Sequence, residues 1–310
     1  LFDHYVYCIA SEGDVQEGVT AEASALAGHQ ELGNLIVLWA RNHISIEEDT
    51  DVAFTEDVPA RYRAYGWDVQ RVDWIKTGNY VEDVQELYNA IERAKTVTDK
   101  PSFIEVRTII GYPAPNKQNT GSVHGSKLGA EEIVETKKIL GFDPEKSFFI
   151  EDEVLAHTRK LRERGAAAHK VWNEKFEAWA QANPERAKLY NRLVSGEMPV
   201  DYKAAFPVFE PGTSLATRAA SGKVINAIAD TFPELWGGSA DLAGSNLTTI
   251  NNAESFNPVS HSTEDWTGNP YGRVLHLGIR DQGAAAIVNG FVLYSTTRAF
   301  PGTFFVFLDY

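Results

Sequence analysis

The chain has 310 residues, 43% of them hydrophobic and 23% charged, which is enough for one large or two ordinary domains with a sizeable core. The formal net charge of -14 at pH 7 argues against nucleic acid as the main partner, because phosphate backbones require basic surfaces. No apolar run is long enough to span a bilayer, and the only cysteine, Cys8, cannot form an internal disulfide. We therefore expect a cytoplasmic protein without a membrane partner.

The first third of the chain alternates strand and helix patterns. His4–Ala10 is almost continuously apolar and predicts a strand covered on both faces, with Cys8 in the core. A helix over 16–30 and a buried strand over 35–40 complete a β-α-β unit, whose two strands should run parallel. The elements predicted next are a helix over 57–65, a strand over 67–72, a helix over 81–97 and a strand over 102–110.

A loop rich in Pro, Gly and Asn over 111–129 follows, and loops of this length are often functional. Beyond it the patterns predict helices over 130–140 and 152–182, a proline-marked linker, and a second α/β unit. The elements of that unit are a helix over 214–231, strands over 235–238 and 273–279, a helix over 281–294 and a strand over 303–310. The alternation indicates an α/β fold with mainly parallel sheets flanked by helices. Because both ends read as buried strands, we expect a piece of a longer protein.

Polar residues follow the first two predicted strands where each strand ends. Glu12 and Asn42 should therefore emerge at the same edge of the sheet, where open α/β folds bind ligands. Carboxylate, amide and carbonyl oxygens are ligands suited to Mg²⁺ or Ca²⁺ beside phosphate oxygens. Taken alone this spacing is weak, since an acidic residue before Gly13 in a strand–helix turn is most often only a turn.

These residues belong to a larger pattern. Ser11–Gly18 followed by Asn42–Ile46 is similar to the thiamine-diphosphate motif, in which Gly-Asp-Gly precedes an Asn by about thirty residues. Further blocks resemble transketolases of the actinobacterial type: Phe54–Asp57, Arg61–Trp67, Asn119–Gly125, Trp236–Asn246, Gly278–Gln282 and Gly302–Phe304. The blocks follow the family's order, and the similarity covers essentially the whole chain.

The resemblance implies a thiamine-diphosphate-binding fold made of two incomplete domains. Residues 1–185 would be the C-terminal part of the diphosphate-binding domain, 186–212 a linker, and 213–310 the N-terminal part of the pyrimidine-binding domain. It also implies a metal site formed by Glu12, Asn42 and the backbone carbonyl of Ile44. The cofactor contacts that it implies are Gly13, Asn42, Ile46, His124, Asp241, Asp281, Phe304, Phe307 and Tyr310.

Three residues match the family's catalytic positions. Asp281 would hydrogen-bond the cofactor's pyrimidine ring, His124 would contact the diphosphate and the reacting sugar, and Glu17 matches a glutamate near the subunit interface. Arg218 and Ser245 match residues that bind the substrate phosphate, a role that suits a guanidinium because of its bidentate geometry. The spacing of Phe304, Phe307 and Tyr310 also fits a plain buried segment.

The implied function is transketolase activity. A two-carbon ketol unit would pass from xylulose 5-phosphate to ribose 5-phosphate or erythrose 4-phosphate, through a thiamine-diphosphate carbanion and in a homodimer. Three departures leave alternatives open: Glu12 stands where the family has Asp, Asp281 where it has Glu, and Gln282 where His is usual. A paralogue or subunit of low activity is one alternative. The other is a sister enzyme, dihydroxyacetone synthase or deoxyxylulose-phosphate synthase. We expect these 310 residues alone to be inactive.

Overall fold

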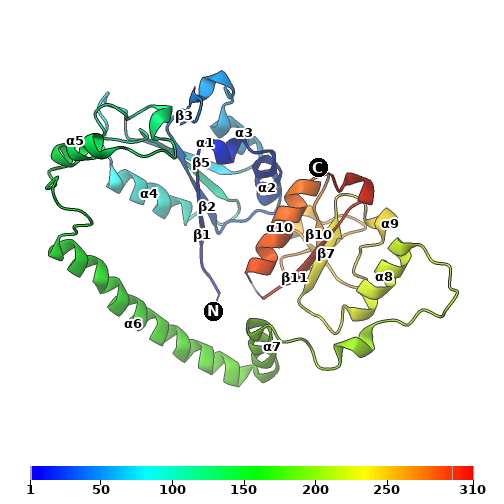
Figure 1. Cartoon of the computed structure of the whole chain (residues 1–310). Coiled ribbons are helices and arrows are strands. Elements are labelled where there is room, and N and C mark those ends of the chain that lie inside the picture. Colours follow the sequence, from blue (N-terminus) through cyan, green and yellow to red (C-terminus); the bar gives the residue numbers. More distant parts are fainter. Residues whose placement is uncertain (1, 295, 310) are drawn as a thin grey trace. The chain divides into compact units, whose positions relative to one another are not determined.

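The structure, a computed structural model, describes residues 2–294 and 296–309. The chain forms two compact units (Figure 1). The first contains the residues up to Glu17 together with Ala27–Ala178, and the second contains Gly18–Leu26 together with the residues from Trp179 onward.

A four-stranded sheet forms the centre of the first unit, in the order β1-β2-β6-β5. Its strands are β1 (Val6–Ala10), β2 (Leu35–Arg41), β5 (Asp68–Asp73) and β6 (Ser102–Arg107), and every pair is parallel. The predicted parallel β-α-β unit is therefore confirmed. A short antiparallel hairpin, β3 (Ile44–Ser45) with β4 (Glu48–Asp49), follows β2.

The helices of this unit begin and end where the local chemistry favours it. They are α1 (Glu12–Gln16), α3 (Val58–Ala64), α4 (Val84–Ala94), α5 (Ala130–Leu140) and most of α6 (Asp152–Ala182), with 3-10 turns η1 (Thr50–Val52) and η2 (Gly121–Val123). Helix α2 (Gly18–His29) is divided, because its residues up to Leu26 belong to the second unit. The carboxylates of Asp57 and Asp83 accept N–H groups at the starts of α3 and α4. Gly141 ends α5 with a left-handed backbone, φ 78°.

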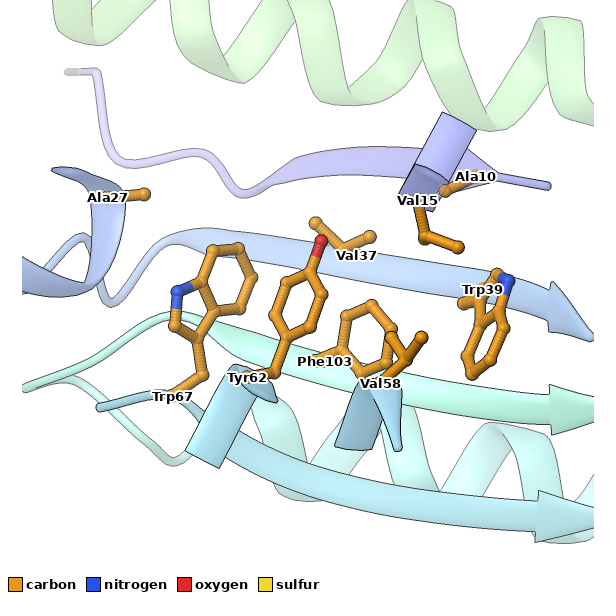
Figure 2. Packing of buried hydrophobic residues seen from close by; sticks show 9 residues of the cluster. All are labelled: Ala10, Val15, Ala27, Val37, Trp39, Val58, Tyr62, Trp67 and Phe103. Atoms are coloured by element: carbon orange, nitrogen blue, oxygen red, sulfur yellow. The ribbon is translucent and has the colours of Figure 1, made fainter. Parts of the chain in front are cut away.

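Two cores cover the two faces of this sheet because successive residues of a strand point to opposite sides. On one face Trp39 and Phe103 pack with Val58 and Tyr62 of α3, and the rings of Tyr62 and Phe103 stack with centroids 3.8 Å apart (Figure 2). The other face packs against α4 through Ile36, Val72, Ala90, Ala94, Ile104 and Val106. Truncating a ring such as Phe103 to Ala would cost about 3–5 kcal/mol.

The prediction that the first strand is covered on both faces was wrong. Val6, Tyr7 and Ile9 are exposed, Ile9 to 81%, and Cys8 is also exposed. In the part of the chain that the structure describes, strand β1 lies at the edge of the sheet and pairs with β2 alone. Within the described residues only Ala10 of this strand is buried.

A five-stranded parallel sheet forms the second unit, in the order β11-β7-β10-β8-β9. The strands are β7 (Leu235–Ser239), β8 (Ser255–Phe256), β9 (Gly268–Asn269), β10 (Val274–His276) and β11 (Arg298–Gly302). The helices are α7 (Pro184–Ser195), α8 (Thr217–Ile228), α9 (Ala243–Asn246) and α10 (Asp281–Leu293), with 3-10 turns η3 (Tyr202–Ala205), η4 (Val259–His261) and η5 (Phe305–Phe307).

Neighbouring residues of β10 serve opposite faces of this second sheet. Leu275 packs with Ala284 of α10 and with Leu26, a residue of α2 that belongs to this unit. Val274 packs on the other face with Ile225 of α8 and with Ile250. The helices therefore flank the sheet on both sides, as the alternating pattern predicted.

A buried ion-pair cluster connects α7 to this sheet. Glu234 lies just before β7, and its side chain is 2% exposed. Arg192 of α7 donates to both carboxylate oxygens, at 2.9 and 2.8 Å, and Arg298 of β11 lies 3.4 Å away. Burial acts to raise the pKa of Glu234, but the hydrogen bonds and charge of Arg192, a backbone hydrogen bond and the hydrogen bond from Arg298 together outweigh it and hold that pKa below its usual value.

Three other elements differ from their predictions. The final strand was predicted over 303–310, but the strand is β11 and the later apolar run forms η5. Pro301 lies inside β11, which is an edge strand and therefore tolerates proline. The helix predicted over 16–30 starts earlier and is split at Glu17, which has an extended backbone. Helix α7 occupies part of the predicted linker, whose limits stay a prediction.

The structure also addresses the possibility of a membrane span. No helix in the described residues has both the length and the apolar character that crossing a bilayer requires. Helix α6 has the length, at 31 residues, but charged side chains occur throughout its sequence.

Candidate functional site

The carboxyl edge of the first sheet brings together Glu12 and the segment after β2. Glu12 lies two residues beyond β1, at the start of α1, and is 4% exposed. Its Oε1 accepts the backbone N–H groups of Asn42 and His43, both at 2.7 Å. The sequence prediction that these chain segments converge is therefore confirmed, although the contact is from carboxylate to backbone.

Asn42 orders the turn that follows. Its Oδ1 accepts the N–H of Ile44 at 2.8 Å, an Asx-type turn that leads the chain into β3. Ile44 is buried, whereas Ile46, at the tip of the hairpin, is 77% exposed. Gly13 faces open space, because a Cβ added there would meet nothing within 4 Å.

The donor set at this edge fits a hard divalent cation that accompanies a diphosphate. The second oxygen of Glu12 takes no hydrogen bond from the described residues, and the amide oxygen of Asn42 retains a lone pair. No group of three His, Cys, Asp or Glu side chains in the described ranges could hold a metal. A cation here would therefore also need backbone carbonyl and phosphate oxygens.

Positive charge surrounds the same edge. Arg41 and Arg107 are register partners at the ends of β2 and β6, and Arg41 pairs with the buried Glu105 at 2.6 Å. Burial lowers the pKa of His43, and the charges of Arg41 and Arg107 lower it further, so this imidazole is neutral near pH 7. Sequence reasoning missed Arg107, because its proximity depends on strand register.

His124 lies beyond η2 in the long loop 111–129. It is exposed, and its N–H donates to the carbonyl of Gly121 at 3.0 Å. The loop is held at its base by the carboxylate of Glu132, which accepts the N–H groups of Asn116 and Lys117 at 2.7 and 3.1 Å. Glu17 ends α1 and is exposed, with no hydrogen bond or ion pair to the described residues.

Asp281 is the first residue of α10 in the second unit and is half-buried. The hydroxyl of Thr303 donates to its Oδ1. Two residues further, the N–H of Gly283 donates to the carboxylate of Glu22 at 2.6 Å, and a Cβ on Gly283 would approach that carboxylate to 2.8 Å. Sequence reasoning missed Glu22, because nothing in the local pattern links positions 261 residues apart.

Three of the remaining candidates of the second unit are exposed polar residues. Arg218 near the start of α8 and Ser245 in α9 are exposed, and Asp241 is exposed with a left-handed backbone, φ 59°. Phe304 and Phe307 stack on each other at η5, with ring centroids 6.4 Å apart. Tyr310 lies outside the described residues. The roles assigned to all these residues stay predictions.

Comparisons with known proteins agree over both units. Residues 1–199 match the family model described as the transketolase thiamine diphosphate binding domain, and residues 213–310 match the transketolase pyrimidine binding domain. The transketolase of Mycobacterium tuberculosis H37Rv is 54% identical over 310 residues, which is 100% of this chain and 43% of that protein. The transketolase of Bacillus subtilis is 42% identical over 311 residues, 100% of this chain and 44% of that protein.

Solved structures give the same result. A Pichia stipitis transketolase in complex with sedoheptulose 7-phosphate superposes with a TM-score of 0.92 at 38% identity, over 99% of this chain and 44% of that one. Leishmania mexicana transketolase superposes with a TM-score of 0.89 at 34% identity, over 97% of this chain and 43% of that one. The chain thus spans less than half the length of each of these four relatives. With both units matched and the shared edge of the first sheet in place, the chain belongs to the transketolase family.

Proposed function

We propose that the protein containing this chain is a transketolase. It would transfer a two-carbon ketol unit from xylulose 5-phosphate to ribose 5-phosphate or erythrose 4-phosphate. Bound thiamine diphosphate would supply a nucleophilic thiazolium carbon for addition to the ketose carbonyl and a ring that can accept the electron pair of the C–C bond that breaks. The observation that carries the proposal is the contact of buried Glu12 with the segment after β2, in a chain whose two halves both match this family.

The residues of the first unit would hold the diphosphate end of the cofactor. We assign Glu12, Asn42 and the carbonyl of Ile44 to a magnesium or calcium ion, because these are hard oxygen ligands at one sheet edge. Gly13 would leave room for the diphosphate, and Ile46 would contact the thiazolium ring. Arg107 and Arg41 favour a polyanion at this edge electrostatically.

The residues of the second unit would hold the pyrimidine end and the substrate. Asp281 would hydrogen-bond a ring nitrogen and so make the neighbouring amine a base; Thr303 holds that carboxylate in place. Phe304, Phe307 and Asp241 would contact the ring. His124 would contact the diphosphate and the reacting sugar, and the exposed Arg218 and Ser245 would bind the substrate phosphate. We assign Glu17 to the contact with a second subunit of a homodimer, and the whole protein to the cytoplasm.

One assay tests this proposal in the full-length protein. Release of glyceraldehyde 3-phosphate from xylulose 5-phosphate is followed with ribose 5-phosphate, thiamine diphosphate and Mg²⁺ present. We expect turnover that requires the cofactor, and a loss of about a hundredfold in His124→Ala. His157→Ala is the matched control, since His157 is also exposed but lies in α6. Absence of cofactor-dependent release from the unaltered protein would refute the proposal.

A further inference from the structure

The hairpin after Asn42 contains a residue in an unfavourable backbone conformation. Ser45 pairs with Glu48 across a two-residue turn, and Glu48 has φ 73°. When the residue after such a turn has a positive φ, that residue is usually glycine, because a side chain would crowd the backbone in this conformation. A glutamate at this position is disfavoured, so its side chain needs a contact that compensates.

That contact is a hydrogen bond to the loop that carries His124. Oε2 of Glu48 accepts the N–H of Gly121 at 2.7 Å, across 73 positions of sequence. The approach is close, since a Cβ on Gly121 would lie 2.9 Å from the carbonyl oxygen of Ser45 and 3.1 Å from that of Ile46. Only glycine fits between the hairpin and the loop at this distance.

The peptide groups of Gly121 connect two candidate cofactor contacts. Its N–H binds Glu48 of the hairpin, whose tip carries the exposed Ile46. Its carbonyl accepts the N–H of His124. Residues 116 and 117 of the same loop are fixed separately by Glu132. Among the described residues, the hydrogen bond from Gly121 to Glu48 is therefore a side-chain contact that ties the segment carrying His124 to the hairpin.

We propose that Glu48 is a positioning residue that holds His124 beside the hairpin tip at Ile46. This inference rests on the proposed function, in which both of those residues contact the cofactor. Glu48 itself touches neither the cofactor nor the substrate in this assignment. Its carboxylate acts through Gly121, and the left-handed backbone at Glu48 is what directs the carboxylate toward the loop.

Glycine and glutamine variants separate this role from a purely structural one. Glu48→Gly removes the carboxylate and also relieves the backbone conformation, so the fold should not lose stability. Glu48→Gln keeps an oxygen that can accept the N–H of Gly121. Asp201→Gly is the matched control: Asp201 is exposed with φ 55°, and its side chain caps nothing.

Three quantities are measured in the full-length protein: amide exchange at Gly121, the apparent KM values for thiamine diphosphate and xylulose 5-phosphate, and the unfolding midpoint. For Glu48→Gly we expect exchange about tenfold faster and both KM values about tenfold higher, since one charge-assisted hydrogen bond is lost. The unfolding midpoint should stay the same or rise. In Glu48→Gln the exchange rate and both KM values should stay within about threefold of those of the unaltered protein. Asp201→Gly should change neither the exchange rate nor the KM values.

The outcomes distinguish the two proposals. If the unaltered protein turns over substrate but Glu48→Gly leaves exchange and KM unchanged, the positioning role is refuted and the proposed function stands. If the KM values rise only in proportion to a lower unfolding midpoint, Glu48 is structural and the inference is again refuted. If the unaltered protein binds no thiamine diphosphate, the proposed function fails, and faster exchange in Glu48→Gly would then establish the contact without the role.

Discussion

Shortening the Glu12 side chain by one carbon tests how much its two hydrogen bonds to the segment after β2 contribute to local stability. Glu12→Asp withdraws the carboxylate by up to about 1.5 Å. The oxygen now 2.7 Å from the amide nitrogens of Asn42 and His43 would then lie about 4.2 Å from both, beyond hydrogen-bond range. Glu12→Gln keeps the length and removes only the charge.

The magnitudes follow from two hydrogen bonds to a buried charged acceptor. At about 1.5 kcal/mol each, Glu12→Asp should cost about 3 kcal/mol of local stability, whereas Glu12→Gln, which retains two neutral bonds, should cost about half as much. These costs correspond to increases of roughly 150-fold and roughly 10-fold in the equilibrium constant for local opening. Amide exchange at Asn42 and His43, measured with a chelator present, gives both factors directly.

A neighbouring glutamate supplies the control for this comparison. Glu47 is exposed and makes no hydrogen bond to the described residues, so Glu47→Asp should leave exchange at Asn42 unchanged. Equal effects of the two Glu12 variants, or a larger effect of Gln than of Asp, would show that reach does not control this contact. The assignment of Glu12 to a cation at the same edge would then lose its geometric basis.

Two further predictions concern carboxylates of the second unit. Asp281→Glu in the full-length protein should raise kcat/KM by on the order of a hundredfold if reach limits the present carboxylate, and an unchanged rate in the same coupled assay would refute that reasoning. Glu234→Gln should lower the free energy of unfolding by about 3 kcal/mol at pH 7, because it leaves Arg192 beside a buried neutral group. Since the pKa of folded Glu234 lies below its unfolded value, this difference should be present above the unfolded pKa and disappear as the pH falls through the folded pKa. Urea unfolding at a series of pH values measures it, and a difference that persists in acid would contradict the assigned pKa direction.

Local signals were sufficient for most of the elements. The helices over 130–140 and 152–182 have the predicted bounds, and for the first of them Gly141 supplies a left-handed end that the sequence makes visible. The strand predicted over 303–310 failed because a short apolar run carries no period that separates a strand from a turn. The first strand was placed correctly but its burial was not, since burial depends on what packs against β1 and not on its own residues.

The candidate site divides in the same way. Convergence of Glu12 with the segment after β2 follows from the direction of two parallel strands, so it was predictable. The hydrogen bonds of Glu48 with Gly121 and of Glu22 with Gly283 join positions 73 and 261 apart, and no local pattern encodes them. The position of Arg107 was equally unpredictable, because its place beside Arg41 depends on the register between β2 and β6.

The cluster of Glu234 with Arg192 and Arg298 restricts which substitutions this sequence can accept during evolution. Replacing Glu234 alone would leave two arginines without their carboxylate partner. Replacing Arg192 alone would leave the buried carboxylate without its bidentate hydrogen bonds. Acceptable replacements must therefore arise together in three separate stretches of the chain. Diverged descendants should either inherit the trio intact or replace it with apolar side chains as a set.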